Sequence, residues 1–178
     1  AKVRGAKLVA RRASAGESLV TLDGETRKLE PDMPVIADAQ GVVGLGGIMG
    51  GADSEIGDDT EDVLLEAANF DALTVRRAAR KLGMHTEASH RFERGADPEL
   101  PPVAIDYAAA LIAELTGGTV CSGRIDVRPR PWEPHRLSTT AARVSSFMGL
   151  EISPQRIVEI TAGLDLEPLI DGETITVT

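Results

Sequence analysis

The segment GVVGLGGIMGG at residues 41–51 most constrains the fold, because six of its eleven residues are glycine. A backbone this rich in glycine adopts positive φ angles and lets a ligand approach closely. The preceding residues, PVIADAQ, are typical of a strand that leads into this turn. We therefore expect a strand followed by a glycine-rich turn that a ligand can reach.

This glycine-rich turn is not a standard nucleotide-binding motif. It contains neither the G-x-x-x-x-G-K-[ST] phosphate loop nor the G-x-G-x-x-G fingerprint. His85 and His90 are five residues apart, which places them on different faces of a helix, and no paired cysteines accompany them, so a zinc site is not expected. No G-x-S-x-G sequence nominates a serine nucleophile. The chain is therefore expected to hold no cofactor and no metal of its own.

Charge and aromatic content limit the ways in which this chain can bind nucleic acid. The formal net charge of −9 argues against a protein whose whole surface binds a duplex. The charge is uneven, however: residues 51–70 hold seven acids and no base, whereas residues 71–95 hold six bases and three acids. Only five aromatic residues occur, which disfavours base stacking and requires a core of aliphatic residues. We expect one local basic surface on an acidic protein.

The first part of the chain has the pattern of short strands. Residues 17–31, ESLVTLDGETRKLEP, predict two strands joined by a two-residue turn at Asp23-Gly24. Residues 61–70, EDVLLEAANF, have a short apolar centre that suits a buried strand better than a helix.

A helix is predicted to begin after Asp71, whose side chain can cap the first turn, and to end at Gly83. Leu73, Ala78 and Leu82 form its apolar stripe. The opposite face is basic, and the pattern fits a functional surface and an ordinary solvated face equally well. The basic residues are Arg76, Arg77, Arg80 and Lys81.

A proline-rich linker, RPRPWEPHR, divides the rest of the chain. Before it we expect a helix over residues 102–115, closed by Thr116-Gly117-Gly118, with its alanine-rich face in the core. A strand-like stretch is expected at residues 119–127. After it we expect two helices, the second capped by Ser153 with Pro154 in its first turn, and a final strand.

The sequence is typical of a soluble cytoplasmic protein. No run approaches the roughly 20 apolar residues that span a bilayer, and the sequence AKVRGAKLVARR lacks the apolar segment of a signal peptide. The single cysteine, Cys121, fits a reducing compartment and is expected to be a small buried residue. Neither end resembles a natural terminus, so we expect an excerpt of a longer protein.

Three segments of the sequence follow one another between residues 43 and 98: VGLGGIMGGADS, TEDVLLEAANFD and RRAARKLGMHTEASHRFERGADP. Together they resemble the editing region, the B3/B4 domain, of the bacterial phenylalanyl-tRNA synthetase beta subunit. The flanking LDGETRKLEPDMPVIAD and ITVT also fit that family. The resemblance implies an α+β fold, with a layered B3/B4 domain over residues 1–128. Residues 129–178 would be a linker and the first part of a small winged-helix-like B5 domain.

The same resemblance carries an editing pocket over to Gly50, Gly51, Glu66, Thr86 and Ala88. Gly50 and Thr86 are expected to be catalytic, and the other three to bind the substrate. The resemblance implies that Glu66 recognises the phenolic hydroxyl of a misattached tyrosine, because phenylalanine would leave that acceptor unpaired. Without a pocket, Glu66 would be a surface ion-pair residue, Gly50 and Ala88 packing residues, and Thr86 the cap of a turn.

The activity implied by the resemblance is hydrolysis of mischarged Tyr-tRNA(Phe) by water, without a covalent enzyme intermediate. As a hypothesis, N–H groups of the glycine turn stabilise the developing oxyanion. The family also has an editing-site histidine upstream of the position of AKVRG, and none of His85, His90 and His135 matches it.

The resemblance also implies partners for the whole enzyme. These are the acceptor end of tRNA(Phe) and the alpha subunit, in a heterotetramer of two alpha and two beta subunits, with neither membrane nor DNA. ATP and magnesium are implied for the whole enzyme and not for this piece. A noncatalytic RNA-binding or subunit-docking scaffold is the main alternative, and a freestanding homologue of the domain is a third.

Overall fold

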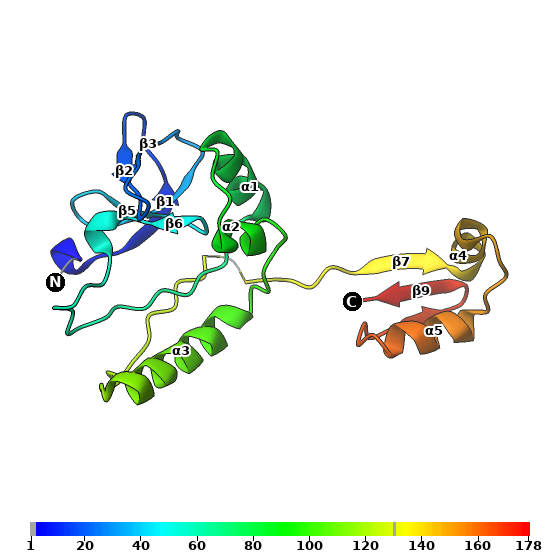
Figure 1. The fold of residues 1–178 in the computed structure, drawn as a ribbon. Coiled ribbons are helices and arrows are strands. Elements are labelled where there is room, and N and C mark those ends of the chain that lie inside the picture. Colours follow the sequence, from blue (N-terminus) through cyan, green and yellow to red (C-terminus); the bar gives the residue numbers. More distant parts are fainter. Residues whose placement is uncertain (1–2, 130) are drawn as a thin grey trace. The chain divides into compact units, whose positions relative to one another are not determined.

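The fold consists of two compact units, one that extends to Val127 and one that begins at Arg128 (Figure 1). The structure is a computed structural model that describes residues 3–129 and 131–178. Its helices and antiparallel sheets confirm the predicted α+β class. The assignment of the two units to B3/B4 and B5 domains stays a prediction, and Arg130 of the predicted linker lies outside the described residues.

A four-stranded antiparallel sheet forms the centre of the first unit. Its strands are β1 (Val9–Arg12), β4 (Pro34–Ala37), β5 (Val42–Leu45) and β6 (Met49–Gly50), in the order β1-β4-β5-β6. The predicted strand before the glycine-rich segment is β4, and that segment itself supplies β5, a tight turn and β6. The turn therefore lies at the edge of the sheet, at its β6 end.

A separate hairpin, β2 (Ser18–Val20) with β3 (Thr26–Lys28), confirms the predicted pair of strands. Its turn is longer than predicted: the Thr21 amide donates to the Glu25 carbonyl at 3.0 Å, which leaves a three-residue loop. Gly24, with φ at 81°, ends that loop in the left-handed conformation that such loops require.

Helix α1 (Ala72–Lys81) confirms the predicted cap, because the Asp71 carboxylate accepts from the Thr74 amide at 2.8 Å. The predicted apolar stripe is partly wrong: Leu73 is 58% exposed. The predicted Ala78 is buried and Leu82 packs against the core, but Val75 and Ala79 are buried where the prediction had Leu73. The residues of α1 that are buried are Val75, Ala78 and Ala79.

The core of the first unit is aliphatic, as the low aromatic content predicts. Val35 of β4 and Val75 of α1 are completely buried, and Met33 is 1% exposed. Phe70 and Phe92 pack against this core from one side. The buried members of the cluster are Ala13, Leu19, Leu29, Met33, Val35, Leu45, Ile48, Val75, Ala78, Ala79 and Met84.

Two of the predicted strands are wrong. Residues 61–70 are irregular, with Val63 and Leu64 exposed, and residues 119–127 form no strand either. Cys121 is exposed and not buried as expected. Both stretches contain apolar residues, but no described strand lies beside them to pair with their backbones, so the apolar pattern alone does not make them strands.

The short helix α2 (Glu87–Phe92) follows α1, and the long helix α3 (Leu100–Thr116) follows in turn. Gly117, with φ at 70°, ends α3 as the glycine pair predicts. The expected core face of α3 is wrong, because none of its residues is buried. No described element covers the helix along its length. Short 3-10 turns occupy Arg4–Ala6 (η1) and Ala52–Ser54 (η2).

The second unit is a three-stranded antiparallel sheet, in the order β7-β9-β8, with two helices. Both predicted helices and the final strand are present, and the Ser153 hydroxyl caps the second helix by accepting from the Arg156 amide at 3.2 Å. No helix in the described parts of the chain is long and apolar enough to cross a membrane. The elements are β7 (Leu137–Thr140), α4 (Ala141–Met148), α5 (Pro154–Ala162), β8 (Leu169–Asp171) and β9 (Thr174–Val177).

The ion pair of Arg11 with Glu17 contributes to the stability of the first unit in a way that depends on pH. The guanidinium donates to both carboxylate oxygens at 2.6 and 2.9 Å. This pairing, with the Ser14 amide, lowers the pKa of Glu17 from 4.5 to about 2. A lowered pKa stabilises the fold above pH 4.5, and this contribution disappears as the pH falls towards 2.

We therefore expect Glu17→Gln to lower the free energy of unfolding by about 1 kcal/mol at pH 7. The difference from wild type should shrink between pH 4.5 and pH 2. Urea titrations over that range, followed by circular dichroism, measure it. Glu25→Gln, on an exposed glutamate of the hairpin loop, is the control. A difference that stays constant with pH would contradict the assignment.

Candidate functional site

A hollow of about 580 Å³ lies in the first unit, between the glycine-rich turn, the irregular chain before α1, helix α2 and the start of α3. This volume is within the range of small-molecule sites. Three of the five predicted site residues line it, namely Gly50, Glu66 and Ala88. Thr86 and Gly51 do not. Other lining residues include Ile36, Val43, Gly46, Gly47, Met49, Phe70, Phe92 and Leu100.

The glycine turn between β5 and β6 packs directly against two phenylalanine rings. Gly47 has φ at 69°, and a Cβ atom there would lie 3.1 to 3.2 Å from atoms of Phe70, Val75 and Phe92. A Cβ at Gly46 would lie 2.7 Å from the Phe70 ring. The absence of side chains at these positions therefore allows the rings to cover the turn.

Gly51 and Gly50 lie side by side but face different constraints. The Gly51 amide donates to the Val43 carbonyl at 2.8 Å, and a Cβ at Gly51 would lie 2.6 Å from that same oxygen and 2.8 Å from Leu19. The Gly50 carbonyl accepts from the Leu22 amide at 3.1 Å, and a Cβ at Gly50 would meet only the Leu22 side chain, at 3.4 Å. Gly51 thus allows the backbones to meet, whereas Gly50 borders the hollow.

Thr86 is the N-cap of α2 and also joins that helix to the glycine turn. Its hydroxyl accepts from the Ser89 amide at 3.0 Å and donates to the Ile48 carbonyl at 2.7 Å. The Ser89 hydroxyl in turn accepts from the Thr86 amide, which completes a capping box. This arrangement fixes the start of α2, and with it Ala88, against the hollow.

Glu66 and Asp97 are the two carboxylate residues that line the hollow, and the Asp97 carboxylate already accepts from the Glu99 amide at 2.8 Å. The segment that carries it is anchored where the Asn69 side-chain amide donates to the Ala96 carbonyl at 2.7 Å. Within the described residues, no hydrogen bond or ion pair engages the Glu66 carboxylate, so it is not the surface ion-pair residue of the simpler interpretation. The residue is exposed overall, but partial desolvation of its carboxyl group raises its pKa above the usual range.

Sequence reasoning missed the aromatic wall of the hollow. Phe70 and Phe92 form an edge-to-face pair with ring centroids 5.4 Å apart, and both line the hollow. The available signal was that two of the five aromatic residues, Phe70 and Phe92, lie within the segments that carry the resemblance. An edge-to-face pair offers an apolar surface against which a substrate ring can pack.

His85 and His90 lie closer together than their spacing suggests. Their ring centroids are 5.7 Å apart, so the expectation of different faces is wrong. Thr86 caps the helix between them, and a residue just before a cap meets the fourth residue of the helix. No group of three or more potential metal ligands occurs among the described residues.

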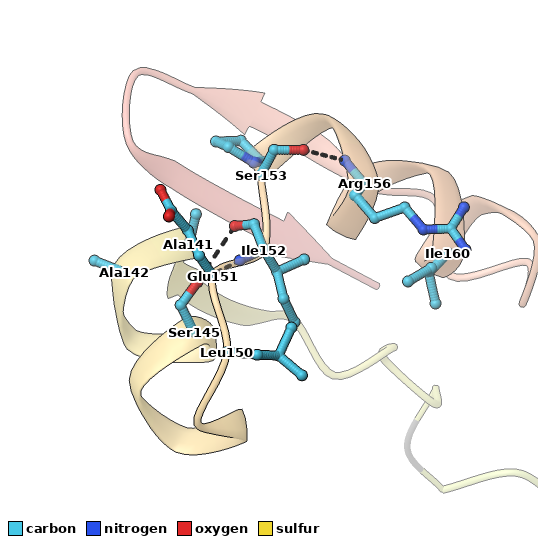
Figure 2. A pocket seen from close by; sticks show the side chains of 10 residues that line it. Ala141, Ala142, Ser145, Leu150, Glu151, Ile152, Ser153, Arg156 and Ile160 are labelled. Carbon is cyan, nitrogen blue, oxygen red and sulfur yellow. Dashed lines mark hydrogen bonds between the residues drawn. The ribbon is translucent and has the colours of Figure 1, made fainter.

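The second unit has its own hollow of about 880 Å³ (Figure 2). Ser145 holds its floor through a hydrogen bond from the Ile152 amide at 2.9 Å. Glu151 and Arg156 lie on its rim, and no predicted site residue belongs to it. The side chains expected to carry chemistry are therefore confined to the first unit.

Comparison with known proteins gives a family and a set of relatives. The model of the B3/4 domain family matches residues 1–117. The chain is similar to the phenylalanine–tRNA ligase beta subunit of Syntrophotalea carbinolica, at 42% identity over 96% of this chain and 22% of that protein. For the beta subunit of Geobacter sulfurreducens the identity is 49%, over 82% of this chain and 18% of that protein. The chain thus spans about a fifth of the length of these curated relatives.

Substitutions at the two adjacent glycines are expected to have contrasting effects on the free energy of unfolding. Gly51→Ala places a methyl group against the Val43 carbonyl and should lower the free energy of unfolding by roughly 1–3 kcal/mol. Gly50→Ala should change it by no more than about 0.5 kcal/mol, because only a flexible leucine lies nearby. Chemical denaturation followed by circular dichroism measures both. Equal effects of the two substitutions would show that the close approach at Gly51 does not limit the fold.

Proposed function

Because the chain belongs to the B3/4 domain family, we propose that its first unit is an editing module of a phenylalanine–tRNA ligase beta subunit. Its reaction is hydrolysis of the ester that joins a mistakenly attached tyrosine to tRNA(Phe). The hollow beside the glycine turn is the proposed site. The family and the beta-subunit relatives support the class of protein, and the chemistry of the hollow supports the substrate.

The observation that carries the proposal is the unpartnered Glu66 carboxylate on a largely apolar hollow. The phenolic hydroxyl of a tyrosyl ring packed against Phe70 and Phe92 can donate a hydrogen bond to this carboxylate. A phenylalanyl ring would leave the carboxylate without a partner after displacing its water, which typically costs about 1–3 kcal/mol. An unpartnered acceptor at this place in a largely apolar hollow therefore selects tyrosine over phenylalanine.

The other predicted residues have supporting roles in this proposal. Gly50 and Ala88 leave space for the ring, because neither has a side chain larger than a methyl group. Thr86 acts through position: both functions of its hydroxyl are engaged by Ser89 and Ile48. Gly51 likewise acts by holding the turn against β5, since its amide is already bound to Val43.

The proposed chemical step is attack of water on the ester carbonyl carbon. A bond forms from the water oxygen to this carbon, the carbon–oxygen bond to the terminal ribose breaks, and the ribose oxygen takes a proton. The negative charge on the carbonyl oxygen is stabilised by N–H groups of the glycine turn other than those of Gly46, Ile48 and Gly51, which already bind backbone carbonyls. A ribose hydroxyl assists the proton transfer. No covalent intermediate is required.

ATP and magnesium belong, in this proposal, to the whole ligase and its alpha subunit. The residues present here do not fit them. The amides of Gly46, Ile48 and Gly51 are bound to backbone carbonyls of the turn and sheet, so they do not form a phosphate cradle. The proposed partners are the acceptor end of tRNA(Phe) and the alpha subunit, in a cytoplasmic assembly of two alpha and two beta subunits.

The proposal predicts that Glu66 determines selectivity. The chain, and a version continued upstream to include the histidine implied by the resemblance, are incubated with Tyr-tRNA(Phe) and with Phe-tRNA(Phe). In the longer version, the tyrosyl ester should be lost faster than the phenylalanyl ester. Glu66→Ala should reduce the ratio of the two rates about 10- to 100-fold.

Glu61→Ala is the matched control, since it removes an exposed carboxylate from the same irregular segment outside the hollow. It should leave the ratio unchanged. Intact esters in the longer version would contradict the hydrolase and support a noncatalytic RNA-binding or docking scaffold. Unchanged selectivity in Glu66→Ala would remove Glu66 from the site.

A further inference from the structure

Helix α1 presents three arginines on the face that points away from the core. Arg76, Arg77 and Arg80 are exposed, and at 100° per residue they occupy roughly one third of the helix circumference. This confirms that the basic residues of α1 face outward. The exposed Leu73 lies on the same face, opposite the buried residues of the helix. We call Arg76, Arg77 and Arg80 the arginine face.

Within the described residues, no side chain neutralises the charges of the arginine face. No hydrogen bond or ion pair is described for Arg76, Arg77 or Arg80. Lys81, one position further along, differs from them because its ammonium group binds Glu30 at 2.5 Å and Asp32 at 3.2 Å. The first unit thus pairs the lysine at the end of α1 with acids and leaves the three arginines free.

Asp71, an acid that Arg77 affects electrostatically, is already engaged. The Asp71 carboxylate accepts from the amide and the hydroxyl of Thr74, which caps the helix. Arg77 adds a weaker electrostatic effect to these hydrogen bonds, and all of them lower the pKa of Asp71. The cap accounts for the carboxylate, so Arg77 keeps its guanidinium available.

The arrangement carries an energetic cost in the free protein. Arg76 and Arg80 are four residues apart, where two like charges on one helix face repel each other and destabilise the helix by a few tenths of a kcal/mol. The overall charge of −9 shows that acids are abundant elsewhere, yet none is placed to relieve this repulsion. An anionic partner would relieve it.

We propose that the arginine face binds the phosphate backbone of RNA, and this inference rests on the proposed action on tRNA. A guanidinium binds phosphate through two parallel hydrogen bonds and stays charged at any physiological pH. Arg76 and Arg80 are separated by one helical turn, about 6 Å along the axis, which lets them reach successive phosphates of one strand. No aromatic residue lies on the face, so it binds the backbone without reading bases.

The test compares two triple variants that remove equal charge. The first is Arg76→Gln with Arg77→Gln and Arg80→Gln. The control is Arg91→Gln with Arg124→Gln and Arg156→Gln, whose arginines are exposed but each paired with one acid. Fluorescence anisotropy measures the binding of the complete chain to unacylated tRNA at several salt concentrations.

The arginine-face variant should bind roughly 10-fold or more weakly at low salt, and the slope of log K against log salt should fall by about 2 to 3. The control should keep most of the affinity and slope. Equal losses in both variants would overturn the proposal, because net charge alone would then explain binding. Circular dichroism checks that both variants are folded.

Two further measurements distinguish RNA binding by the arginine face from binding of acidic polypeptides and from the proposed hydrolysis. Polyglutamate is added as a competitor, and displacement of the RNA at equal charge concentration would indicate a site for acidic polypeptides instead and overturn the RNA assignment. Cleavage of a tyrosyl ester on a single adenosine should be unchanged in the arginine-face variant. If wild type cleaves no ester but shows the expected RNA binding, the proposed hydrolysis fails while the arginine face stands.

Discussion

The close packing at the glycine turn is the constraint on which the rest of the first unit depends. Three different elements meet this turn: the hairpin through Leu22 and the Gly50 carbonyl, α2 through Thr86 and the Ile48 carbonyl, and the aromatic pair through contact with Gly46 and Gly47. Each approach needs backbone that carries no side chain or a carbonyl that points outward. A single β-carbon at Gly46, Gly47 or Gly51 would separate them.

Because of this constraint, different elements supply the different groups of the hollow. In the proposed site, the turn supplies the backbone groups at the end where the ester lies. The irregular segment before α1 supplies Glu66, held in place at Asn69 by a hydrogen bond to Ala96. The phenylalanine pair fills the space between them. The proposal therefore assigns selectivity and chemistry to different elements, which meet at the glycine turn.

The features predicted most accurately from the sequence are those that a few neighbouring residues determine. The Asp71 and Ser153 caps, and the glycine that ends α3, each depend on a few adjacent residues, and all three are present. The strands expected at residues 61–70 and 119–127 depend on a distant pairing partner, and neither forms. The meeting of His85 with His90 likewise depends on the cap at Thr86, which spacing alone does not show.

The candidate site shows the same division. Family resemblance nominated five residues, and the structure brings Gly50, Glu66 and Ala88 to one hollow. It places Thr86 and Gly51 behind that hollow, where hydrogen bonds occupy their polar groups. Phe70 and Phe92 were not predicted, because their contact joins segments more than twenty residues apart. Side-chain roles that arise from packing become visible only once the chain is folded.

The central claim is that the Glu66 carboxylate accepts a hydrogen bond from the phenolic hydroxyl of a tyrosine ring in the hollow. Its most direct measurement is calorimetric binding of adenosine carrying tyrosine or phenylalanine through a 3′-amide, which cannot be hydrolysed. The account predicts that the tyrosyl compound binds roughly 10-fold or more tightly at neutral pH, and that Glu66→Ala removes this difference. Equal affinities for the two compounds in the wild-type protein would contradict it.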